Sequence, residues 1–159
     1  MFSTMSLSVC LPALFSGPVR AQAPWGLAAP TTPNAQRNAL NVVKSQVDWL
    51  QNAIRTAPNY RQGGYGVLRQ AFDGLRGAYF AFKPTLTQKQ LYYGANDLAE
   101  LDAGLDIIQE AFGNFQEDIN DGRDGASALH SLCQVLGQAT GVWWQELKQD
   151  SARLGVGRP

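Results

Sequence analysis

The sequence predicts an all-α protein, organised as an antiparallel up-down four-helix bundle. Three observations lead to this prediction. Apolar residues recur at steps of three and four over four long segments, and no segment alternates in the way typical of strands. Short runs rich in Pro, Gly, Asn and Asp separate these segments. The chain has 159 residues, of which 45% are hydrophobic, which is enough for one domain. Because the connections between the predicted helices are short, neighbouring helices are expected to be antiparallel.

Residues 1–23 are predicted to be a cleaved signal peptide. Residues 5–15 are uncharged and mostly apolar, and small residues follow where a signal peptidase cleaves, at Val19, Ala21 and Ala23. We therefore expect export, to the periplasm or out of the cell. Lipidation at Cys10 and an uncleaved apolar N-terminus are the alternatives. Without Cys10 the chain keeps Cys133 alone, so no internal disulfide is expected.

Residues 24–33 contain three prolines and are predicted to form an extended linker. Helices are expected at residues 34–57, 62–82, 88–120 and 126–153, followed by a disordered tail at 155–159. Signals for helix starts are Thr32-Pro33, a capping box made by Thr87 with Gln90, and Asp124. The third helix is unusually long, and a bend at Gly94 or Gly104 is expected.

Each predicted helix carries one apolar seam, as in helices that pack at shallow angles. The seam residues are Leu40, Val43, Val47, Leu50, Ile54 and Ala57; Tyr65, Leu68, Phe72, Leu75, Tyr79 and Phe82; Leu98, Leu101, Leu105, Ile108, Phe112, Phe115 and Ile119; and Leu129, Leu132, Leu136, Ala139 and Trp143.

The third predicted helix and the turn after it are strongly acidic. Residues 96–124 hold nine carboxylates and one arginine. On the helix, none of the carboxylates falls on the apolar seam, and no Glu-x-x-His pair occurs, so neither a di-metal site nor acid/base catalysis is expected. The only histidine, His130, lies one helical turn from Cys133, and we interpret the two as a structural pair. The sequence thus predicts a protein that is not an enzyme, with no catalytic residue, metal or cofactor.

The second predicted helix has a basic flank, in which Arg69, Arg76 and Lys83 are seven residues apart. Acidic residues flank the seam of the third helix, which favours charge pairing between the two helices. Binding of an anionic ligand by these three residues is the alternative. Because the formal net charge is zero, nothing in the overall charge favours nucleic acid as a partner.

The fourth predicted helix suggests a contact surface. Residues 126–145 carry no charge but are too polar to span a membrane. Glycine inside a helix costs about 1 kcal/mol relative to alanine, so Gly137 and Gly141 suggest close approach of another helix. We expect these glycines, with Trp143 and Trp144, to bind another helical protein or a second copy of this chain; the alternative is that this helix is simply the most enclosed one of the monomer. The predicted function is an exported interaction or assembly module; the alternative is a carrier or sensor of a small apolar or anionic ligand.

Overall fold

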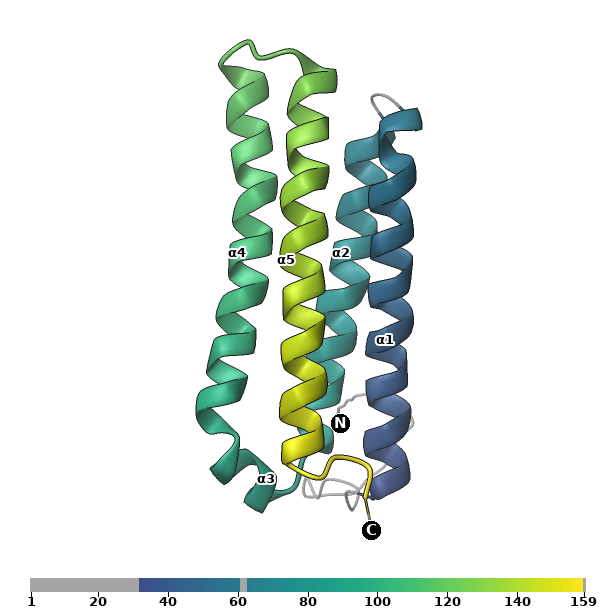
Figure 1. The fold of residues 1–159 in the computed structure, drawn as a ribbon, viewed down its shortest axis with the longest axis vertical. Helices are drawn as coiled ribbons and strands as arrows, with labels where there is room; N and C mark the ends of the chain where they lie inside the picture. Colours follow the sequence, from purple (N-terminus) through teal and green to yellow (C-terminus); the bar gives the residue numbers. More distant parts are fainter. Residues whose placement is uncertain (1–31, 61–62, 159) are drawn as a thin grey trace, which may run out of the picture. The chain divides into compact units, whose positions relative to one another are not determined.

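A computed structural model describes residues 32–60 and 63–158, and all regular structure in them is helical (Figure 1). The α-helices are α1 (Pro33–Thr56), α2 (Gly63–Phe82), α3 (Gln88–Tyr93), α4 (Ala95–Asn120) and α5 (Gly125–Arg153), and two 3-10 turns, η1 (Ala57–Tyr60) and η2 (Lys83–Thr85), follow α1 and α2. The prediction of an all-helical protein is therefore confirmed. The predicted signal peptide and most of the proline-rich linker lie outside the described residues.

The helix starts follow the local signals in the sequence. Thr32 Oγ1 accepts from the backbone N–H of Ala35 at 3.0 Å, with Pro33 at the first helical position. Thr87 and Gln90 form the predicted capping box at the start of α3. At the start of α5, the Asp124 carboxylate accepts from the N–H of Ser127 at 3.0 Å. All three predicted caps are confirmed.

The predicted third helix, residues 88–120, is divided in two at Gly94. A Cβ atom at Gly94 would lie 2.7 Å from Leu154 Cδ1 and 2.9 Å from the Gln90 carbonyl oxygen. The glycine therefore lets the corner between α3 and α4 approach the end of α5 closely. Of the two positions considered for a bend, Gly94 is the one where the helix ends.

The long helices are packed against one another, α1 on α2, α4 on α5 and α1 on α5. Tyr65 near the start of α2 stacks on Phe115 near the end of α4, with ring centroids 4.8 Å apart. Tyr79 near the end of α2 donates to the carbonyl of Leu98 near the start of α4. The largest fully buried side chains come from all four long helices: Leu50; Leu68, Phe72, Leu75, Tyr79 and Phe82; Leu101, Leu105, Ile108 and Phe112; and Leu136 and Leu147.

Residues 155–158, which the sequence predicts to be disordered, instead form hydrogen-bonded turns against α1. Gly155 and Gly157 take positive φ values of 74° and 79°, which glycine adopts without strain. The N–H of Gly157 donates to Gln36 Oε1 at 2.9 Å. The Gln36 amide, only 3% exposed, also donates to the Thr85 carbonyl at 2.9 Å and to Gln90 Oε1 at 2.6 Å. One buried side chain thus links α1, η2, α3 and the tail.

Candidate functional site

Trp143, one of the four residues predicted to bind a partner, belongs to the core. It is 2% exposed, and its indole N–H donates to the Leu101 carbonyl at 3.0 Å. A Cβ atom at Gly104 would lie 2.9 Å from Trp143 Cδ1, so the glycine on α4 makes room for the indole. The side chain of Trp143 therefore holds α5 against α4.

The other three predicted partner residues are separated by four and three positions and therefore share one side of α5. A Cβ atom at Gly137 would lie 3.9 Å from Ile54 Cγ2, so Gly137 faces α1. A Cβ at Gly141 would meet nothing within 4 Å, so Gly141 faces open space. Trp144 is half-buried, and the Lys148 ammonium lies 5.7 Å from its ring centre. Trp143 is thus the one predicted partner residue that the structure places apart from the other three, because it points into the core toward α4.

The predicted basic flank of α2 lies along α4. Lys83 forms the expected inter-helix pair with Asp102, at 3.0 Å. Arg69 lies 4.9 Å from the centre of the Phe112 ring and 3.7 Å from Asp73. The exposed guanidinium of Arg76 lies over the ring of the next turn, that of Phe80. In the described part of the chain, these three cations are spread along a helix–helix contact and line none of the hollows described below.

A groove of about 590 Å³ runs between α4 and α5. Three large apolar side chains on its walls are well exposed: Ile107 (59%), Val135 (47%) and Val142 (64%). Small residues such as Gly104 and Ala139 line it as well. Apolar side chains gathered in this way on a surface are typical of contact sites for other molecules.

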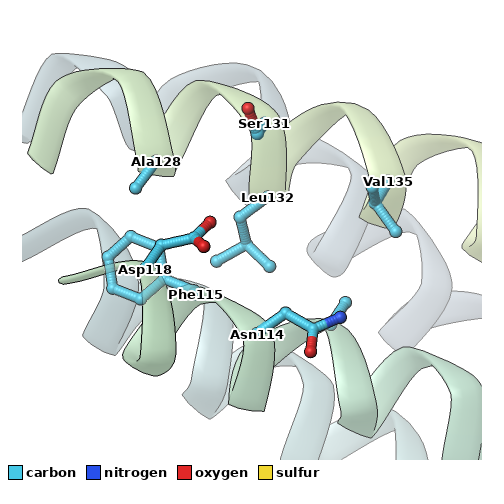
Figure 2. Close-up of a pocket in the computed structure, with 8 residues that line it drawn as sticks. Asn114, Phe115, Asp118, Ala128, Ser131, Leu132 and Val135 are labelled. Atoms are coloured by element: carbon cyan, nitrogen blue, oxygen red, sulfur yellow. The ribbon is translucent and has the colours of Figure 1, made fainter. Parts of the chain in front are cut away.

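The hollow continues along the same two helices toward the turn that joins them. Figure 2 shows this continuation, of about 140 Å³, with Phe115 and Asp118 on α4 facing Ala128 and Leu132 on α5. Val135 lines both hollows. We name the combined feature the α4/α5 groove; it extends along α4 from Glu100 to Asp118, about 27 Å at the helical rise of 1.5 Å per residue.

Sequence reasoning missed this groove, although a signal for it exists. Each exposed wall residue directly precedes a buried seam residue, as the following pairs show: Ile107-Ile108, Val135-Leu136 and Val142-Trp143. The seam residues alone account for the core, so the extra apolar residue of each pair widens the stripe toward the neighbouring helix. Val135 and Val142 are seven residues apart and therefore repeat on one side of α5.

One end of the α4/α5 groove is acidic. Glu100 and Glu146 lie on its opposite walls, and both are exposed. Asp150 follows one turn beyond Glu146, and its pKa is raised, first by burial and then by the charges of Glu146 and Glu100. The Arg153 guanidinium lies 3.7 Å from Asp150 and also contacts Asp97, whereas Glu100 and Glu146 have no ion-pair partner among the described residues.

The raised pKa of Asp150 predicts a pH-dependent loss of stability. The folded state binds this proton more tightly than the unfolded chain, so the contribution of Asp150 to stability falls as pH rises through its folded pKa. Its charged neighbours are Glu100, Glu146 and Arg153, and the buried hydroxyl of Tyr79 is also close enough to interact. We expect Asp150→Asn to be more stable than the wild type at pH 7 and to lose this advantage in acid. Thermal unfolding of both proteins from pH 3 to 7 checks this; a variant less stable at pH 7 contradicts it.

A separate pocket of about 760 Å³ lies near the turn between α4 and α5. Its lining is mostly apolar and includes Tyr65, Phe115, Ile119 and Leu129. The one cation in that lining, Arg123, pairs with an aspartate of α4 at 2.8 Å and donates to a serine hydroxyl of α5 at 2.7 Å. This pocket has room for a small apolar ligand but offers no uncommitted charge to bind an anion.

Cys133 and His130 lie in different surroundings on α5. The thiol of Cys133 is buried, and burial raises its pKa, which disfavours the thiolate, whereas His130 is exposed. Within residues 32–60 and 63–158, no three His, Cys, Asp or Glu side chains gather as a metal site would require. In the same ranges, no helix combines the length and apolar character needed to cross a membrane.

Comparisons of the chain with protein-family models, with curated proteins and with solved structures found no match.

Proposed function

We propose that this chain is a non-catalytic protein–protein interaction module whose docking surface is the α4/α5 groove. One observation carries the proposal: Ile107, Val135 and Val142 line a single groove and are each about half or more exposed. Exposed apolar residues scattered singly over a surface need no explanation, but a contiguous set lining a groove does.

The binding free energy expected from burying these three side chains supports a contact with another protein. Fully burying a Val or Ile side chain stabilises a complex by roughly 1.5–3 kcal/mol, so covering the exposed half of each of these three contributes about 1 kcal/mol apiece. Small residues between them, such as Gly104 and Ala139, let a partner approach the helix backbones closely. We still propose another helical protein as the partner. The proposed contact surface is now the side of α5 that faces α4, and no longer the side that carries Gly137, Gly141 and Trp144.

We also propose that residues 34–154 act as an up-down four-helix bundle, with α3 as a corner within the third segment. The antiparallel contacts of α2 with α4, and the Trp143–Leu101 hydrogen bond between α4 and α5, support this arrangement. Such a bundle presents rigid helix pairs, on which a docking groove keeps its shape. Export through a signal peptide at residues 1–23 remains part of the proposal, on the grounds of the apolar run and the small residues after it.

A carrier of a small apolar ligand is the weaker alternative. The 760 Å³ pocket lined by Tyr65 and Phe115 is the observation in its favour. The charged residues first considered for an anionic ligand, Arg69, Arg76 and Lys83, lie elsewhere, along the α2–α4 contact.

The proposal is tested by placing a charge in the groove. Val142→Lys is expected to reduce capture of the physiological partner at least tenfold, because the lysine cannot be buried against an apolar surface without a large desolvation cost. Val42→Lys on α1, at 51% exposure against 64% for Val142, is the matched control and should capture the partner as the wild type does. Quantitative co-purification from the producing cell measures both.

Both substitutions are at exposed helix positions, so each should change the unfolding free energy by less than about 0.5 kcal/mol. Thermal unfolding verifies that any loss of capture is not a loss of fold. Undiminished capture by a folded Val142→Lys protein would show that the groove is not the docking surface.

A further inference from the structure

We infer that the occupant of the α4/α5 groove is an amphipathic helix with cationic residues at one end. The inference rests on the proposed function, since it names the kind of partner that the same groove takes. It follows from two properties of the groove, the chemistry of its lining and the position of its charges.

The lining favours a helix over an extended peptide. The central part of the groove is lined mostly by apolar or small residues, such as Ala103, Gly104, Ile107 and Val142, with Gln138 as its one uncharged polar side chain. An extended segment lying on it would leave most of its backbone N–H and C=O groups facing side chains that cannot pair with them, since Gln138 could serve only one or two of them. A helix satisfies these groups internally and presents only an apolar stripe to the groove.

The dimensions agree with this occupant. The groove lies between two antiparallel helices (Figure 1) and is about 27 Å long, the length of roughly five helical turns. Large apolar residues project from both walls, Ile107 from α4 and Val135 and Val142 from α5. Side chains repeating every three or four residues on a docked helix can interdigitate with such a double row.

The charges give the occupant a direction. Glu100 and Glu146 face each other across one end and take part in no ion pair among the described residues, and the nearby Arg153 is already held by Asp97. At the other end, Asp118 is paired with Arg123 at 2.8 Å. The groove is therefore acidic at one end and balanced at the other, and Lys or Arg residues of the partner belong beside Glu100 and Glu146.

A second copy of this chain does not meet the same requirement. If two copies paired groove to groove, neither could neutralise the other's glutamates, because no Lys or Arg lines either part of the groove among the described residues. The two glutamates would stay unneutralised. A separate helical partner with its own cations fits the groove better.

The test uses two synthetic helical peptides of 18 residues that share one leucine stripe and differ at one end. One carries three lysines in its last turn and the other three glutamates. Binding to the purified chain is measured by fluorescence anisotropy at physiological ionic strength. We expect the lysine peptide to bind at least tenfold more tightly than the glutamate peptide, and this difference to shrink at high salt.

Variants of the protein locate the effect. The double variant Glu100→Lys/Glu146→Lys should bind the glutamate peptide more tightly than the lysine peptide. Val142→Lys should reduce the affinity for the lysine peptide at least tenfold. Val42→Lys is the matched control and should bind like the wild type. Circular dichroism of each variant verifies the fold.

The possible failures separate the inference from the proposed function. If both peptides bind equally and Val142→Lys weakens both, the groove is a docking site but its partner is not selected by charge, and the inference is overturned. If neither peptide binds, or binding ignores Val142→Lys, the inference is overturned as well, and the co-purification test then decides the proposed function by itself. A concentration-dependent dimer in sedimentation, lost in Val142→Lys, would assign the groove to a second copy instead.

Discussion

Replacing Trp143 by alanine is expected to lower the unfolding free energy by about 3–5 kcal/mol, the usual cost of removing a large aromatic side chain from a core. The indole is almost completely buried, packs edge-on against Tyr79 and donates to the Leu101 carbonyl. Its removal leaves a cavity at the α4–α5 contact and takes away the hydrogen bond between the two helices. Since domains of this size are stable by only about 5–15 kcal/mol, the loss should be visible as a much lower urea midpoint.

Trp144→Ala is the matched control for this prediction. The neighbouring tryptophan is half-buried at the edge of the core, under the ammonium of Lys148, so its removal leaves a smaller cavity. We expect the loss of stability to be clearly smaller than for Trp143→Ala. Equal losses for the two variants, or a small loss for Trp143→Ala, would contradict the assignment of Trp143 to the core.

Gln36→Leu is expected to cost about 2–4 kcal/mol, because it removes hydrogen bonds from several buried groups at once. The amide accepts from Gly157 and donates to Thr85 and Gln90. Leucine has a volume similar to that of glutamine, so the loss of unfolding free energy comes mainly from the unpaired polar groups and not from a cavity. Urea unfolding measures the effect.

The control for Gln36→Leu is Asn38→Leu, an exposed position on the same helix. It should change the unfolding free energy by less than about 0.5 kcal/mol. Amide hydrogen exchange adds a local readout: Gly157 should lose its protection in Gln36→Leu and keep it in Asn38→Leu. A protected Gly157 in the Gln36 variant would show that the tail is held by other contacts.

The features that sequence reasoning predicted correctly are those fixed by residues close together in the chain. The caps at Thr32, Thr87 and Asp124 each depend on groups three residues away. The all-helical class follows from apolar periodicity, which reports the buried side of each helix. These signals are local, so neighbouring helices are not needed to read them.

The features that it missed depend on residues far apart in the chain. The sequence predicts a bend at Gly94 or Gly104, but the contact that favours Gly94 comes from Leu154, sixty residues later, and the tail is held by Gln36 at the start of α1. The periodicity of α5 placed Trp143 on the seam, but it could not show that Gly104 makes room for it. The α4/α5 groove, likewise, exists only because α4 and α5 lie beside each other.

The central claim is that the α4/α5 groove receives a partner helix, and photo-crosslinking in the producing cell tests it most directly. A benzophenone side chain is placed at position 142 in the groove or at position 42 on α1, in chains that are otherwise identical. We predict crosslinks to a partner from position 142, suppressed by the lysine peptide, and none from position 42. Crosslinks that form equally from position 42, or that the peptide does not suppress, would contradict the claim.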